Sequence, residues 1–113
     1  MQYMLLIYGN DGEWESRSDE EKQAIYAEYR AVSESPGIAG GAELQPATTA
    51  TTVRVNGNGE ALTTDGPFAD TKEVLGGYFL FEADDLDAAI DVAARIPAAR
   101  TGGAVEVRPV VER

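Results

Sequence analysis

The sequence predicts a single α+β domain, and three observations carry that prediction. The segments Gln2–Tyr8 and Gly76–Ala83 have apolar side chains on both faces, so each must be covered twice and belongs in the middle of a sheet. Each segment precedes a stretch with helical periodicity. The order of strand, helix, hairpin, strand, helix and strand contains two strand-helix-strand halves, which is the plan of a ferredoxin-like sandwich. At 113 residues the chain is expected to form one domain, 1–113.

The first helix is expected to begin after Ser18 and to run to about Ser35. Ser18 is followed three places later by Glu21, which makes a capping box. Spacings of four and three residues predict a buried stripe of Ile25, Tyr29 and Val32. Pro36-Gly37 then ends the helix.

The stretch between this helix and the second central strand is expected to hold a hairpin. Ile38–Ala42 is rich in Gly and Ala and is predicted as a loop, followed by a short extended piece at Glu43–Pro46. Alternating residues in Thr51–Asn56 and Glu60–Thr64 flank Gly57-Asn58-Gly59, a pattern typical of a hairpin.

The second helix is expected to begin at a cap formed by Asp84 or Asp85 and to end at Pro97. Helix capping accounts for these aspartates better than a calcium loop, because the Gly and terminal Glu of such a loop are missing. The inner side of the helix is predicted to comprise Leu86, Ala89, Ile90, Ala93 and Ile96. The last strand is Ala104–Val111, and its Pro109 favours an edge position.

Two helices can cover only one face of such a sheet, so the apolar residues of the other face need another cover. A second copy of the chain is the simplest source, because closed twofold pairs are the commonest oligomers. We therefore predict a homodimer joined through the open sheet faces.

The composition limits the chemistry. The chain has no Cys and no His, so it lacks a thiolate nucleophile, a disulfide and the usual base near neutral pH, and no metal site or cofactor is predicted. A formal net charge of -11 disfavours direct binding to nucleic acid or to anionic membranes. The apolar start Met1–Tyr8 is too short to span a bilayer and lacks the features of a signal peptide, so a cytoplasmic location is expected.

The polar loop Asp65–Glu73 is the leading candidate for a functional site. Gly66 and Pro67 favour a tight turn, and polar side chains stand beside the aromatic Phe68 between two predicted strands. Such loops often carry binding or chemistry. The alternative is a well-formed turn whose charges are simply solvated.

The predicted site combines Asp65, Lys72 and Glu73 with residues from neighbouring strands. Asp65 is the candidate acid or base, and Glu82 could join it. The predicted ligand-binding residues are Tyr8, Phe68, Lys72, Tyr78 and Arg108. The alternative is a set of structural ion pairs at the rim.

Three aromatic residues of the first half are expected to be mainly structural. Tyr26 and Tyr29 are predicted to lie in the core or at its rim. Trp14, the only Trp, lies in the predicted polar loop Gly9–Glu15, where it could cover a pocket or contact a partner. Packing against its own domain is the preferred interpretation.

The loop sequence Asp-Gly-Pro-Phe-Ala-Asp-Thr-Lys-Glu at Asp65–Glu73 resembles the signature of the DGPF branch of the YCII-related family. Weaker similarities extend over nearly the whole chain, at Tyr3–Tyr8, Leu44–Pro46, Ala50–Arg54, Leu75–Tyr78 and Val105–Val110. The resemblance implies a dimeric α+β barrel with a small-molecule cleft in each subunit. It also implies a link to extracytoplasmic-type sigma factors, beside which such proteins often occur. The His-Asp pair proposed for the wider family has no His here, so only its aspartate could remain, with Asp65 as the candidate.

Three hypotheses follow for the function. The first is a small-molecule-binding domain whose cleft is lined by the Asp65 loop. The second is a regulatory module that contacts a sigma factor through the same loop, and the third is an enzyme that uses Asp65 without a His. A pocket enclosing Asp65 and Arg108 favours binding or catalysis, whereas a projecting loop with exposed Phe68 favours docking.

Overall fold

A computed structural model describes all residues, 1–113, and places four strands in one antiparallel sheet. The strands are β1 (Gln2–Gly9), β2 (Ile38–Glu43), β5 (Val74–Glu82) and β6 (Ala104–Pro109), in the order β2-β5-β1-β6. The two strands predicted to be central, β1 and β5, lie side by side in the middle. The mixed α+β architecture is consistent with the ferredoxin-like plan.

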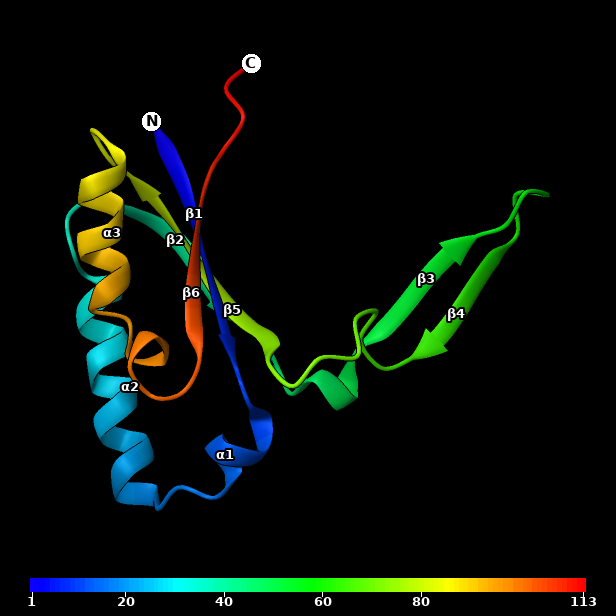
Figure 1. Cartoon of the computed structure of the whole chain (residues 1–113), viewed down its shortest axis with the longest axis horizontal. Helices are drawn as coiled ribbons and strands as arrows, with labels where there is room; N and C mark the ends of the chain where they lie inside the picture. Colours follow the sequence, from blue (N-terminus) through cyan, green and yellow to red (C-terminus); the bar gives the residue numbers. More distant parts are fainter.

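The longer helices, α2 (Asp19–Ser33) and α3 (Leu86–Ala94), lie on one side of this sheet (Figure 1). Ser18 and Asp85 cap them as predicted: the Ser18 hydroxyl accepts from the Glu21 amide at 3.1 Å, and an Asp85 carboxylate oxygen accepts from the Ala88 amide at 2.9 Å. Each cap satisfies a backbone donor that the first helical turn leaves free. None of the helices combines the length and apolar character needed to cross a membrane.

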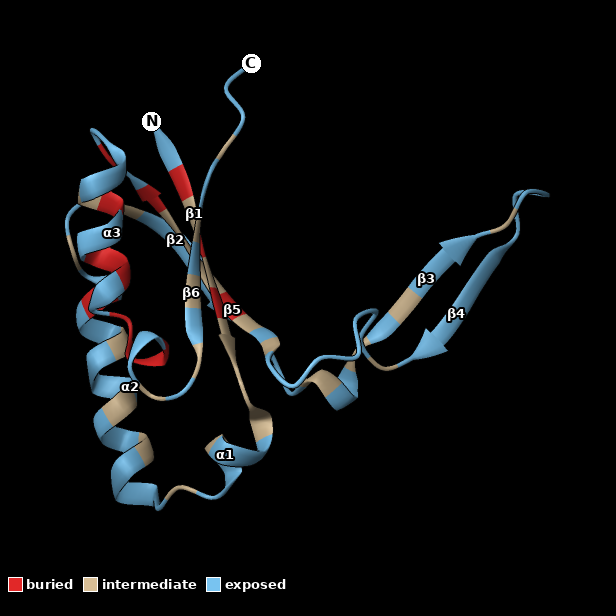
Figure 2. Ribbon diagram, in the orientation of Figure 1, coloured by how far each residue is buried: buried red, intermediate tan, exposed pale blue.

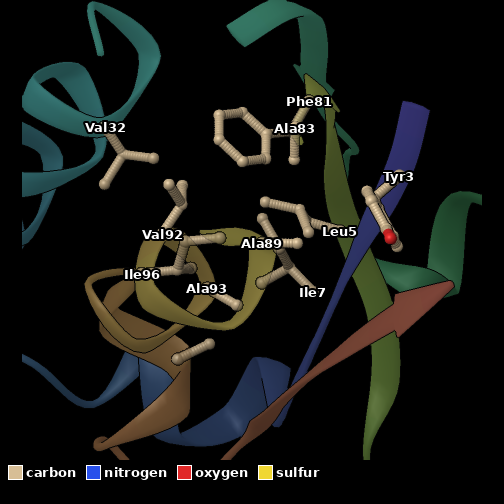
Figure 3. Packing of buried hydrophobic residues seen from close by; sticks show 11 residues of the cluster. Tyr3, Leu5, Ile7, Val32, Phe81, Ala83, Ala89, Val92, Ala93 and Ile96 are labelled. Atoms are coloured by element: carbon tan, nitrogen blue, oxygen red, sulfur yellow. The ribbon is translucent and has the colours of Figure 1, made fainter. Parts of the chain in front are cut away.

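The core fills the space between the sheet and these helices (Figure 3). From the strands it receives Tyr3, Leu5, Ile7 and Phe81, and from the helical side Val32, Ala89, Val92, Ala93 and Ile96. Leu5 and Ile96 have no exposed surface. The predicted inner side of α3 is partly wrong, because Leu86 and Ile90 are 48% and 47% exposed while Val92 is buried in their place.

The edge strand β2 was not predicted as a strand. Ile38–Ala42, predicted as a loop, belongs to β2, which pairs with β5. At Gly41 a Cβ atom would lie 2.6 Å from the Tyr78 carbonyl oxygen, and at Gly77 one would lie 2.8 Å from the Ala42 carbonyl oxygen. Glycine thus permits a close approach of the two strands, and pairing with β5 overrides the low strand propensity of this segment.

The predicted hairpin forms, but it stands outside the main sheet. Strands β3 (Thr51–Val55) and β4 (Ala61–Asp65) pair only with each other. The hairpin extends away from the body on the side of the sheet opposite to α2 and α3 (Figure 1), and nearly all of it is exposed (Figure 2). We call Thr51–Asp65 the arm.

The second face of the sheet, which we call the open face, has no element packed on it. Strand alternation gives this face Met4, Leu6, Tyr8, Tyr78 and Leu80, together with Glu106 and Arg108 of β6. The five apolar or aromatic residues of this set are only half-buried. The open face is therefore an apolar strip bordered by one charged edge.

Candidate functional site

A cleft of about 1170 Å³ lies between α2, the short helix α1 (Asp11–Glu15) and one end of the sheet. The segment predicted as the loop Gly9–Glu15 thus contains α1, which begins where the Asn10 side chain accepts from the Glu13 amide at 3.0 Å. The sheet contributes Gly41 and Gly77 to its lining.

An aromatic cluster borders this cleft. Trp14 of α1 meets Tyr26 of α2 edge to face, with ring centres 5.2 Å apart, and the Lys22 ammonium lies 5.8 Å from the Trp14 ring centre. Tyr29 lies one turn further along α2 and also lines the cleft. Trp14 packs against its own domain, as preferred, and at the same time forms part of a concave surface.

Hydrogen bonds tie the cleft walls together. The Tyr26 hydroxyl donates to Glu43 Oε1 of β2 at 3.1 Å, which links α2 to the edge of the sheet. The Ala47 amide donates to Asp11 Oδ2 at 2.9 Å, which links α1 to the chain leading into the arm. These bonds span segments far apart in sequence and fix the shape of the opening.

Burial raises the pKa of both cleft tyrosines on α2. For Tyr26 the loss of solvent comes first and the hydrogen bond to Glu43 adds to it. For Tyr29 burial is again the main cause, although a backbone contact with Ala98 opposes it. Both phenols therefore hold their protons more tightly than free tyrosine does and remain neutral hydrogen-bonding groups at physiological pH.

The raised pKa of Tyr29 predicts a stability change at alkaline pH. The folded chain holds the phenol proton more tightly than the unfolded chain, so this stabilisation is complete below the unfolded value of 10.0 and is lost as pH rises through the folded-state pKa. Urea unfolding of Tyr29→Phe should show a shallower loss of unfolding free energy above about pH 10 than the unsubstituted protein. Equal losses in the two proteins would contradict the assignment.

The predicted site residues are not brought together. Asp65 is exposed at the end of β4, and Phe68 is 71% exposed with the Arg54 guanidinium 4.7 Å from its ring centre. Lys72 and Glu73 are exposed. None of these side chains lines the cleft, so the loop meets the description of a projecting loop with an exposed aromatic.

The remaining predicted residues lie on the sheet. Tyr8 and Tyr78 border the cleft, although strand alternation assigns their side chains to the open face. Arg108 is exposed and pairs with Glu106 on its own strand at 3.0 Å, while Glu82 pairs with the N-terminal ammonium at 2.9 Å. The Asp65–Glu73 loop approaches the cleft at one point, where the Asn10 side chain donates a hydrogen bond to the Lys72 carbonyl at 3.4 Å.

No group of three or more acidic side chains converges in a way that could hold a metal ion. The cleft carries the carboxylates Asp11, Glu13, Glu15 and Glu43 and the guanidinium groups of Arg17 and Arg30. Its polar groups are therefore of both signs, arranged around an aromatic wall. Such a lining can hold a ring by stacking and can orient its polar substituents by hydrogen bonding.

The comparisons with known proteins agree on the family. The model of the YCII-related domain matches residues 1–113. The chain is also 36% identical over 115 aligned residues to an uncharacterised protein of Rhizobium meliloti (strain 1021), and the alignment covers 97% of this chain and 92% of that protein. The resemblance inferred from the Asp65–Glu73 loop is thereby confirmed at the level of the family. Because the match extends over the whole chain, the protein belongs to the YCII-related domain family.

Proposed function

We propose that the protein is a small-molecule-binding homodimer whose ligand occupies the cleft between α1, α2 and the sheet. The observation that carries the proposal is the aromatic wall of Trp14, Tyr26 and Tyr29 around a cleft of about 1170 Å³. Ligand sites are typically concave and aromatic, with a few placed polar groups. This cleft replaces the Asp65 loop as the binding region.

The lining favours a ligand that contains a flat ring with polar substituents. A ring can stack against Trp14 or Tyr26, while the Glu43 carboxylate and the Arg30 guanidinium offer an acceptor and donors.

The homodimer follows from the open face. A strip of Met4, Leu6, Tyr78 and Leu80 in contact with water is unfavourable, because each apolar side chain gains free energy when it leaves water. A second copy supplies the same strip in a twofold arrangement. The α2 wall of the cleft lies on the helix side of the sheet, away from that interface.

The position of Trp14 allows a direct test of the cleft. Trp14 is the only Trp of the chain, so tryptophan fluorescence reports on the cleft alone. A metabolite panel is screened by thermal shift, and a ligand present at about 100 times its dissociation constant should stabilise by about 2.7 kcal/mol. Such a ligand should also change the Trp14 emission.

Variants separate binding in the cleft from binding elsewhere. Tyr26→Ala should weaken the ligand by roughly tenfold or more, because it removes both the edge-to-face wall and the link to Glu43. Ile90→Ala on the outer side of α3 is the matched control and should bind normally. A stabilising ligand that leaves the Trp14 emission unchanged and binds both variants equally would refute the cleft, and a broad panel without any stabilising compound would refute the function.

A further inference from the structure

The rest of the chain does not cover the arm. Its strands pair with each other and pack extensively on no other element. At the base, the Gly66 amide donates to the Ala50 carbonyl at 2.7 Å and the Thr52 hydroxyl donates to the Gly66 carbonyl at 2.8 Å. Beyond this base the arm is held by its own ladder and by the contact of Arg54 with Phe68.

The arm exposes apolar side chains among its polar ones. Val53, Val55 and Ala61 share one face, on which Val53 is 59% and Val55 is 65% exposed. The other face carries Leu62, which is 50% exposed, beside Arg54. An isolated two-stranded hairpin is at best marginally stable in water, so exposed branched residues on such a hairpin indicate a surface that another molecule covers.

The direction in which the arm projects favours a second copy of the chain as the molecule that covers it. The arm stands on the same side of the sheet as the open face (Figure 1). Packed sheets lie about 10 Å apart, so a copy stacked on the open face would occupy the space between that face and the arm. In a twofold pair each arm would then extend along the other copy.

The charge of the arm is mixed. The net charge of -11 makes two copies repel, and Arg54 is the only cation of the arm. The Arg54 guanidinium is held over the Phe68 ring rather than in an ion pair with its own chain. The arm also carries Glu60 and Asp65, so its direction, not its charge, selects the second copy.

We propose that the arm is an intersubunit clasp, which covers its Val53 and Val55 face against a second copy of the chain. The clasp rests on the homodimer of the proposed function. In this proposal the start of the Asp65–Glu73 loop has a structural role, because Gly66 forms the hydrogen bonds at the base of the arm.

A photo-crosslink tests the clasp directly. The purified full chain carries benzoylphenylalanine in place of Val55, and irradiation should yield a covalent dimer whose crosslink maps to the body or arm of the second copy. Val53→Glu should weaken dimerisation by roughly tenfold or more. Val111→Glu is the matched control, since Val111 is 70% exposed outside any element, and it should change the dissociation constant by less than about twofold.

The outcomes separate the clasp from the dimer. A dimer by sedimentation that gives no intersubunit crosslink, or that is insensitive to Val53→Glu, would overturn the clasp and leave the open-face dimer standing. A protein that sediments as a monomer would overturn both. A crosslink that appears together with selective weakening by Val53→Glu would establish the clasp.

Discussion

Replacing Leu5 by alanine is expected to lower the free energy of unfolding by about 2 to 5 kcal/mol, the range for large-to-small changes in a packed core. Leu5 has no exposed surface and lies in central strand β1 between Phe79 of β5 and Val107 of β6. Truncation would leave a hole beneath both helices that a sheet paired on both sides cannot close. Urea unfolding followed by circular dichroism gives the value.

Leu86→Ala is the matched control for this prediction. Leu86 is 48% exposed at the start of α3, where alanine is also a better helix former, so the change should stay within about 0.5 kcal/mol. If both variants lost similar unfolding free energy, Leu5 would not lie on the buried face of β1.

Replacing Leu80 by glutamate is expected to dissociate the proposed dimer while the subunit remains folded. Leu80 lies on the open face, between Met4 of β1 and Gly40 of β2. In a twofold interface the change would bury two unpaired carboxylates, each at a cost of several kcal/mol. The dissociation constant should therefore rise by at least about 100-fold, as measured by sedimentation equilibrium.

Leu86→Glu makes the same substitution on the helix side of the molecule and should leave association unchanged. Circular dichroism of Leu80→Glu should match that of the unsubstituted chain. If Leu80→Glu associates as strongly as Leu86→Glu, the open face is not the interface between copies.

The sequence predicted the centre of the sheet because β1 and β5 carry their signal in their own side chains. A strand with apolar residues on both faces is stable only where both faces are covered, in the middle of a sheet. Both helix caps were predictable for a similar reason, since Ser18 and Asp85 act on backbone amides three residues away. These features are local and need no knowledge of the rest of the fold.

Strand β2 could not be predicted from such signals. Its glycines give neither alternation nor strand propensity, and it forms because the β5 backbone accepts a close neighbour there. The prediction of the inner side of α3 was partly wrong for a related reason. Leu86 and Ile90 fit the helical period, but the shape of the sheet selects Val92, so the rotation of the helix depends on packing.

Residue types alone could not show which of the predicted site residues would meet. Asp65, Phe68 and Lys72 form a distinctive motif, yet the turn at Gly66, with a φ of 99°, follows an arm that stands away from the body. The cleft instead depends on Trp14, Tyr26 and Glu43, which come from three separate elements. A signal was present in the lone Trp preceding a helix with two tyrosines, but the pairing with β2 was needed to interpret it.

The interaction between copies is the basis of both the proposed dimer and the proposed clasp, and the mass of the protein in solution tests it most directly. Sedimentation equilibrium of the full chain at micromolar concentration should give twice the chain mass of 12.1 kDa. A mass of 12.1 kDa throughout that range would show that Met4, Leu6 and Leu80 face water in the native protein and would contradict the account.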